Sequence, residues 1–302
     1  MKATYRKIWQ DLLRRFPGVA EEPENILEGD LARTAQSAAI QPAVRTILRL
    51  QGYDSPVCLV GEKGTGKEFW ARVIHTHSRR AKGPFLTVDL ETIPPRHISA
   101  FLFGPGRRNG VMMQPQEGKI WQAQGGTIYL HGIEHLTEEA QGKLLLLLQH
   151  GYGRNGNGNG NGQSSPPRIV VGTEADLEQQ VASGKFRKDL FFRLTVFPIA
   201  LPPLRERKED LPHLTLFFLR RYAPILEKRA RLFDASALDW MTRYFWPGNL
   251  DELREFVILN LHFAPENAER ISFRLLPEIL MRSGASVVKP ETARKRRIEM
   301  LK

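Results

Sequence analysis

One short stretch constrains the fold of this chain more than any other: a glycine-rich loop between an apolar run and a helical pattern. The apolar run covers 56–60, the helical pattern covers 69–74, and the loop consists of Gly61, Glu62, Lys63, Gly64, Thr65, Gly66 and Lys67. Such glycines let successive backbone N–H groups converge on phosphate oxygens, while the helix N-terminus and Lys67 add positive charge. A strand, this loop and a helix in this order predict a phosphate-binding P-loop.

The residue after the loop lysine departs from the general P-loop pattern. A Ser or Thr hydroxyl usually follows the lysine and reaches a magnesium ion, whereas this chain has Glu68. The P-loop itself predicts ATP or ADP as the ligand. Because Glu68 replaces the hydroxyl, Mg²⁺ would have to be held by another group or bound weakly.

Strand-like and helical segments alternate along the first two thirds of the chain. After the loop, strand-like runs cover 85–88, 128–130, 169–171 and 196–199. Together with the run before the loop, this alternation predicts an α/β fold with a parallel five-stranded sheet covered by helices. After Pro202 and Pro203 the pattern is helical only, which predicts a small all-α subdomain.

These patterns divide the chain into four parts. We expect an N-terminal helical extension over 1–33, a nucleotide-binding α/β domain over 34–205, a helical lid subdomain over 206–282 and a basic tail over 283–302. Residues 151–167 are low in complexity and rich in glycine and asparagine, so we expect a flexible surface insertion there.

Charge and cysteine content restrict the partners and the compartment. Lys and Arg number 44 against 33 Asp and Glu, and the net charge of +11 attracts phosphate-rich partners without identifying one, so direct DNA binding stays open. The single cysteine, Cys58, cannot form an internal disulfide. No run approaches the roughly 18 apolar residues of a membrane span. We expect a cytoplasmic protein with no membrane partner.

Several further motifs occur in a fixed order between residues 36 and 280. They are GEKGTGKE and ARVIHTHSRR near the loop, Leu102-Phe103-Gly104, Gly125-Gly126-Thr127, FRKDLFFRL over 186–194, PPLRER over 202–207 and WPGNL over 246–250. In these motifs the chain resembles the central domain of NtrC-type activators of sigma-54 RNA polymerase. The resemblance implies an AAA+ fold with a helical lid, a ring oligomer with ATP at subunit interfaces, and hydrolysis that remodels the polymerase.

The resemblance also exposes departures at positions with chemical tasks. After Gly-Gly-Thr the family strand ends in Asp-Glu, where the Asp helps to position magnesium and the Glu polarises the attacking water, but this chain has His131 and Gly132. Loss of a catalytic base alone typically lowers the rate about 10²–10⁴-fold. Glu134 is a candidate substitute for the lost catalytic carboxylate. It lies two residues further along the chain, and an extended chain advances about 3.3 Å per residue, so its carboxylate would be displaced by several ångströms. His131 and His135 are spaced four apart, but they fall at a strand-to-loop junction and not on a helix, so we do not expect a zinc site there.

The positions that sense the nucleotide in the family also differ in this chain. Thr173 and Glu174 align with the family's Thr-Asn pair and place an anion near the γ-phosphate, where like charges repel. Asp251 stands where the lid has an Arg, and Arg254 is considered as a displaced cation.

Two arginines match those that reach a neighbour's nucleotide in the family. These are Arg187 and Arg193, and they imply self-association or assembly with homologous AAA+ subunits, since such arginines act in trans. The family's GAFTGA loop, which contacts the polymerase, is replaced over 105–113 by PGRRNGVMM. That segment is either a surface for another partner, including transcription machinery, or a plain loop.

We therefore predict an ATP- or ADP-binding regulatory relative of the sigma-54 activators, with impaired hydrolysis and with the nucleotide as a structural or switching ligand. The first alternative is a slow but active ATPase that uses Glu134 and drives transcription activation. Two further alternatives are a DNA-associated regulator and a non-catalytic subunit in a ring of active homologues.

Overall fold

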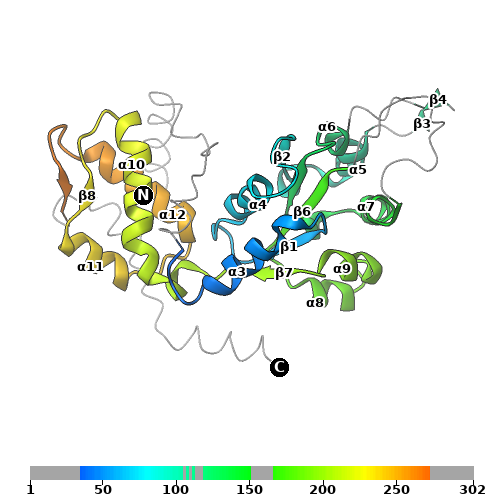
Figure 1. Ribbon diagram of the computed structural model, residues 1–302, viewed down its shortest axis with the longest axis horizontal. Helices are drawn as coiled ribbons and strands as arrows, with labels where there is room; N and C mark the ends of the chain where they lie inside the picture. The colour runs from blue at the N-terminus through cyan, green and yellow to red at the C-terminus, as the bar shows by residue number, and fades with distance from the viewer. Residues whose placement is uncertain (1–34, 105–106, 109–110, 113–117, 151–165, 273–302) are drawn as a thin grey trace. The chain divides into compact units, whose positions relative to one another are not determined.

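A sheet of five parallel strands organises the first of two compact units. The computed structural model describes residues 35–104, 107–108, 111–112, 118–150 and 166–272. The first unit covers Pro42–Pro202, and its strand order is β2-β5-β6-β1-β7 (Figure 1). The strands are β1 (Val57–Val60), β2 (Phe85–Asp89), β5 (Thr127–His131), β6 (Arg168–Thr173) and β7 (Pro198–Ala200). The predicted five-stranded parallel α/β fold is confirmed, although β7 begins two residues later than its apolar run.

The central strands are apolar on both faces because helices cover both faces of the sheet. Every residue of β6 is buried, and so are the first three of β1. Cys58 in β1 is buried too, and this burial raises the pKa of its thiol to about 12.

Helices precede the first strand and connect the strands of the sheet. They are α3 (Gln41–Arg49), α4 (Lys67–Thr76), α5 (Pro95–Phe103), α6 (Lys119–Gln122), α7 (Glu138–His150), α8 (Leu177–Ala182) and α9 (Lys188–Leu194), with short 3-10 helices η2 (Leu50–Gly52), η3 (Leu90–Thr92) and η5 (Ile133–His135). Figure 1 shows α4 on one side of the sheet and α7 and α9 on the other. The leucine run of α7 contributes Leu144, Leu145 and Leu147 to the core on its side.

Close packing of two backbone segments explains the glycine at position 126 in the Gly-Gly-Thr motif. The N–H of Thr127 donates to the carbonyl of Pro84 at 2.9 Å, which starts the pairing of β5 with β2. A Cβ atom on Gly126 would fall 1.9 Å from that same carbonyl oxygen. Only glycine lets the two backbones approach this closely.

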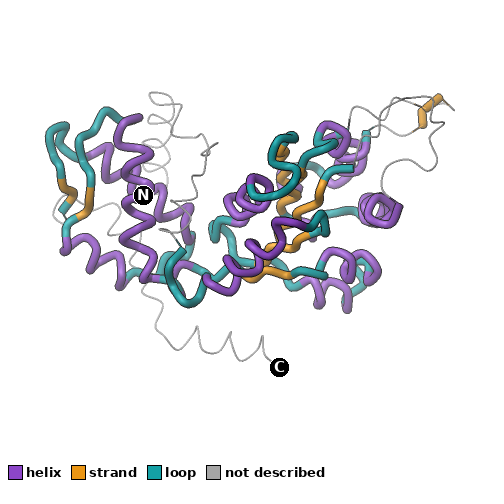
Figure 2. The backbone as a smooth tube through the Cα atoms, in the orientation of Figure 1, coloured by secondary structure: helices purple, strands orange, loops and turns teal. Residues whose placement is uncertain are grey.

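The second unit combines the segment up to Gln41 with the segment from Pro203 onward, and it is mainly helical (Figure 2). Its elements are η6 (Leu204–Glu206), η7 (Lys208–Asp210), α10 (Leu211–Ile225), β8 (Leu232–Phe233), α11 (Ala235–Arg243), α12 (Asn249–Phe263) and β9 (Arg270–Ile271). Trp246 fills the centre of its core and donates its indole N–H to the carbonyl of Met241 at 2.9 Å. The helical lid is confirmed, and it also holds a two-residue parallel pairing of β8 with β9.

A buried carboxylate joins the two segments of this unit. Asp210 is fully buried, and its Oδ1 accepts the N–H groups of Gln36 at 2.8 Å and Ser37 at 2.7 Å. Its Oδ2 accepts the hydroxyl of Ser37 at 3.0 Å. The segment before Pro42 is therefore fixed to the helical unit by charge-assisted hydrogen bonds.

Several predictions fall outside the described residues. These are the N-terminal helix within 1–33, the tail over 283–302, residues 151–165 of the insertion, and most of the loop at 105–113. Of that loop, β3 (Arg107–Arg108) and β4 (Val111–Met112) are described, and they pair antiparallel. Within the described part of the chain, no helix combines the length and apolar content of a membrane span.

Candidate functional site

The P-loop joins β1 to α4 at the carboxyl edge of the parallel sheet. Gly64 and Gly66 have φ values of 75° and 91°, in the left-handed region that favours glycine. Gly66 directly precedes α4 and has no side chain with which to cap it. The first N–H groups of a helix have no partner within the helix, so such an end suits an anion such as phosphate.

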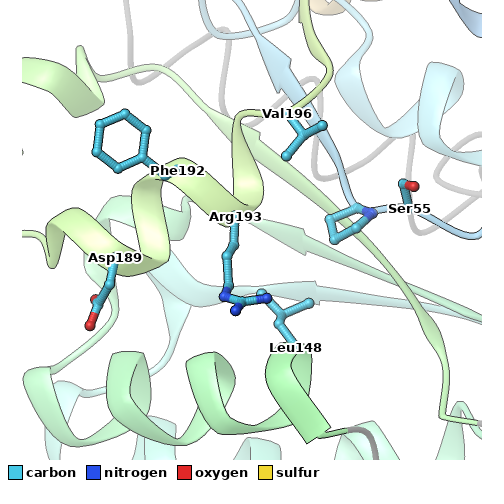
Figure 3. A pocket seen from close by; sticks show the side chains of 7 residues that line it. Ser55, Leu148, Asp189, Phe192, Arg193 and Val196 are labelled. Carbon is cyan, nitrogen blue, oxygen red and sulfur yellow. The ribbon is translucent and has the colours of Figure 1, made fainter.

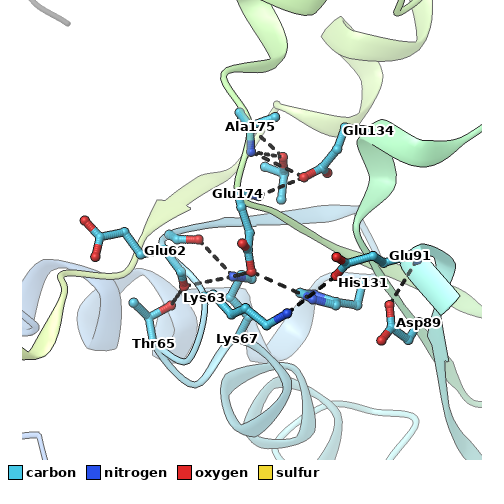
Figure 4. A network of polar contacts seen from close by, with 12 residues as sticks. Glu62, Lys63, Thr65, Lys67, Asp89, Glu91, His131, Glu134, Glu174 and Ala175 are labelled. Carbon is cyan, nitrogen blue, oxygen red and sulfur yellow. Dashed lines mark hydrogen bonds and ion pairs between the residues drawn. The ribbon is translucent and has the colours of Figure 1, made fainter. Parts of the chain in front are cut away.

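Lys67 is the first residue of α4 and is only 4% exposed. Its Nζ donates to the carbonyls of Gly61 at 2.8 Å and Glu62 at 3.0 Å, and it lies 3.1 Å from Oε1 of Glu174 (Figure 4). The hydroxyl of Thr65 donates to the Glu62 carbonyl at 2.8 Å. The structure thus brings the predicted loop residues and the sensor residue Glu174 together around one ammonium group.

Glu68 follows Lys67 in the first turn of α4. Its Oε1 accepts the hydroxyl of Thr87 in β2 at 2.9 Å and lies 3.5 Å from Nη2 of Arg72. The carboxylate is therefore tied to the neighbouring strand and to its own helix. A side chain held in this way does not reproduce the hydroxyl that usually follows a P-loop lysine.

His131 ends β5 where the family has an aspartate. Its Nδ1 lies 3.3 Å from the hydroxyl oxygen of Tyr129, and its Nε2 lies 3.9 Å from Oε1 of Glu174. Burial raises the pKa of Tyr129, so the phenol stays protonated and can donate to Nδ1. Gly132, the next residue, has a φ of 69° and offers no side chain for chemistry.

Glu134, the proposed substitute carboxylate, lies in η5 and faces the turn after β6. Its Oε1 accepts the N–H groups of Glu174 at 3.1 Å and Ala175 at 3.3 Å. Thr173 donates its hydroxyl to the Ala175 carbonyl at 3.1 Å within the same turn. We call the turn formed by Thr173, Glu174 and Ala175 the sensor turn, and the contacts of Glu134 hold it in place.

Two carboxylates beside His131 were missed by sequence reasoning. Asp89 ends β2 and Glu91 lies in η3, and their ligand atoms and one from His131 all lie within 4.8 Å of one another. The register of β2 against β5 places Asp89 opposite His131. Two carboxylates and an imidazole can hold a divalent cation, although Glu91 also lies 3.7 Å from Nζ of Lys63. A sequence signal existed in Asp89 at a strand end, but the strand pairing was unknown.

The two arginines predicted to act in trans lie at α9. Arg187 precedes the helix, is exposed, and forms an ion pair with Asp189 at 2.7 Å, which lowers the pKa of that carboxyl. Arg193 lies on α9 beside a shallow pocket (Figure 3). The other residues that line this pocket are Ser55, Pro56, Leu148, Asp189, Phe192 and Val196.

The lid position predicted to sense nucleotide lies in the second unit. Asp251 is in the first turn of α12, and its Oδ1 is 3.8 Å from Nη2 of Arg254. The side chain of Arg254 is 27% exposed and that of Asp251 is 55% exposed. The carboxylate of Asp251 and the guanidinium of Arg254 therefore lie on the same face of α12, as side chains three residues apart on a helix do.

Two family models match this chain. The sigma-54 interaction domain matches residues 34–200, and the AAA+ ATPase lid domain matches residues 205–292. The DNA-binding transcriptional regulator NtrC of Azospirillum brasilense is 40% identical over 228 residues, which are 74% of this chain and 46% of that protein. The phenol regulator MopR of Acinetobacter guillouiae is 39% identical over 224 residues, covering 74% and 40%. The chain thus spans about half the length of these curated relatives.

Solved structures of NtrX from Brucella abortus are similar along most of the chain. The complex with ADP has a TM-score of 0.70 at 31% identity and covers 87% of this chain and 59% of that one. The complex with ATP has a TM-score of 0.67 at 30% identity and covers 99% and 64%. With its P-loop, parallel sheet and helical lid, and with a family match over more than half of its residues, this chain belongs to the sigma-54 interaction domain family of AAA+ P-loop proteins.

Proposed function

We propose that this chain is a nucleotide-binding regulatory protein, related to the sigma-54 transcription activators, that holds ATP or ADP without hydrolysing it efficiently. The observation that carries the proposal is the contrast between the ends of β1 and β5, two strands that both pair with β6. The P-loop after β1 has its glycines, its helix and its lysine in place. The end of β5 has His131 and Gly132 instead of two carboxylates.

Binding is supported by the fit of the loop to a phosphate chain. Gly64 and Gly66 adopt conformations that favour glycine, the N-terminus of α4 points its dipole at the loop, and Lys67 supplies the cation. Relatives of the same family have been solved with ADP and with ATP. We infer that the backbone N–H groups of the loop and Lys67 would hold the phosphates here.

Weak hydrolysis is supported by the surroundings of Glu134. A general base needs a free carboxylate oxygen within hydrogen-bond reach of the water that it activates. Oε1 of Glu134 already accepts two N–H groups, and its Oε2 is buried away from the surface. Glu134 therefore supports the architecture of the turn and is poorly placed to activate water.

Assembly with other AAA+ subunits is supported by the exposed face of α9. Arg187 and Arg193 are exposed, and the side chains of Phe192 and Val196 beside them are 59% and 57% exposed. We propose that this face contacts a neighbouring copy or a homologous subunit, with sigma-54 or other transcription machinery as the target of the assembly. Direct contact with DNA remains an alternative.

A slow ATPase is the second candidate function, and one observation favours it. Asp89, Glu91 and His131 converge beside the P-loop edge of the sheet and could hold the divalent cation that the lost aspartate no longer positions. This reading needs Asp89 for turnover, whereas the first reading does not.

One experiment separates the two candidates. Equilibrium binding of ADP and ATP and release of phosphate are measured with magnesium for the wild type, Lys67→Ala, Glu134→Gln and Asp89→Asn. We expect the wild type to bind nucleotide without measurable turnover. Lys67→Ala should weaken binding about 10- to 100-fold, as loss of a charge-assisted contact does. Turnover that disappears in Asp89→Asn or Glu134→Gln would refute the first candidate in favour of the second. Sedimentation of the same samples, with Arg193→Ala added, tests the proposed assembly.

A further inference from the structure

The ammonium group of Lys67 has three oxygen partners within the protein. A lysine has three donor hydrogens, and Nζ has three oxygen partners: two P-loop carbonyls and the carboxylate of Glu174. The side chain of Lys67 is 4% exposed, whereas that of Glu174 is 34% exposed. Of the three partners, the carboxylate is the one that carries charge and the one that a side-chain rotation can remove.

Glu174 is held next to the P-loop by the backbone. The register of β1 with β6 pairs Val60 with Thr173, and the N–H of Gly61 donates to the Thr173 carbonyl at 3.2 Å. The first residues after these two strands are Gly61 and Glu174. The position of Glu174 beside Lys67 is therefore a consequence of strand pairing.

Contacts on its other side fix the same residue. The N–H of Glu174 is accepted by Glu134, and Nε2 of His131 lies 3.9 Å from the Glu174 carboxylate (Figure 4). Figure 4 shows the carboxylate between Lys67 and His131. Asp89 and Glu91 add further negative charge next to His131. A third phosphate that reached for Lys67 would therefore meet a carboxylate that is already paired with the ammonium group, with other acidic side chains nearby.

We propose that Glu174 makes this site selective for nucleoside diphosphates, because its carboxylate gives Lys67 the negative partner that the third phosphate of a triphosphate would supply. This inference rests on the proposed nucleotide binding and names which nucleotide the site prefers. The physical cause is repulsion between like charges, which favours the ligand with one phosphate fewer. An acidic side chain at this position thus acts as a specificity determinant for the occupant of the P-loop.

The test compares two ligands on the full chain. Dissociation constants for ADP and for a non-hydrolysable ATP analogue are measured by calorimetry, with magnesium and again with a chelator, for the wild type, Glu174→Gln and Glu178→Gln. Glu178 is an exposed glutamate on α8 and serves as the matched control. We expect the wild type to bind ADP at least about tenfold more tightly than the analogue, a difference of about 1.4 kcal/mol.

Glu174→Gln keeps the shape of the side chain and removes its charge. We expect it to raise the affinity for the triphosphate analogue about tenfold, with a smaller change for ADP, while Glu178→Gln keeps the wild-type ratio. Glu174→Asp serves as a second variant, because withdrawing the carboxylate by one methylene should give an intermediate ratio. Thermal unfolding of each variant verifies that it folds.

The outcomes separate this inference from the proposed function. Equal affinities for the two nucleotides in the wild type, or a ratio that Glu174→Gln leaves unchanged, would overturn the selectivity and leave nucleotide binding intact. Binding of neither nucleotide by the wild type or by any variant would overturn both.

Discussion

Replacing Glu134 by alanine tests whether this carboxylate supports the sensor turn or performs chemistry. In the structure its Oε1 accepts two backbone N–H groups, from Glu174 and Ala175, at 3.1 and 3.3 Å. Alanine would leave both donors without this partner. The turn carries Glu174 next to Lys67, so its geometry matters for ligand binding as well as for stability.

The magnitude follows from the exposure of the site. Hydrogen bonds to charged groups contribute about 1.5–3 kcal/mol each when buried. Glu134 is half-buried and the distances are long, so water can replace part of the interaction. We therefore expect Glu134→Ala to lower the free energy of unfolding by about 1–2 kcal/mol in total. For a unit of this size, that corresponds to a fall in Tm of about 3–6 °C.

The assay is thermal unfolding followed by circular dichroism, with Glu134→Gln and Glu178→Ala measured alongside. Glutamine keeps an acceptor oxygen and should lose less stability than alanine, and the exposed control should change little. A Tm for Glu134→Ala within about 1 °C of the control would refute the supporting role. If that variant also abolished a measurable turnover, Glu134 would be catalytic instead.

Three further predictions concern packing, thiol labelling and titration in the first unit. Gly126→Ala should prevent folding or lower the Tm by more than about 10 °C, because the added Cβ meets the Pro84 carbonyl. In Gly142→Ala on α7 the added Cβ meets nothing within 4 Å, so this variant should raise the free energy of unfolding by about 0.5–1 kcal/mol. Similar Tm values for these two glycine variants would contradict the close approach. The Cys58 thiol should resist iodoacetamide at pH 8 until the protein unfolds, and prompt labelling of the native protein would be inconsistent with its burial. Because folding raises the pKa of this thiol from 9.0 to about 12, its contribution to stability is present below pH 9 and lost as the pH rises toward 12. Cys58→Ala should therefore show a shallower alkaline loss of stability than the wild type, and equal slopes would contradict the shift.

Local sequence patterns were sufficient to predict most of the fold. The central strands are short apolar runs because both faces are covered, and the P-loop is a contiguous motif whose conformation depends on its own glycines. The β8–β9 pairing escaped prediction because each strand has only two residues, too few for a periodic pattern.

The site was harder to predict because its contacts join distant residues. Glu174 was expected near a phosphate from the resemblance alone, but its ion pair with Lys67 spans 107 positions and depends on the register of β1 with β6. Likewise, Asp89 meets His131 only because β2 pairs with β5. A single sequence does not reveal which strands are neighbours. The roles of the two trans-acting arginines and of Asp251 stay predictions.

The hydrogen bonds of Asp210 have a consequence for how this chain can be divided. The helical unit is discontinuous, because residues 36 and 37 supply the donors for a fully buried carboxylate that lies more than 170 positions later, as the separations of 174 and 173 show. A cut that begins the polypeptide at residue 42 would leave that buried carboxylate without these donors, and the loss of hydrogen bonds to a buried charged group is destabilising. The lid of this chain is therefore not a simple C-terminal module. Recombination that preserves stability must carry the short segment before Pro42 together with the helices that it joins.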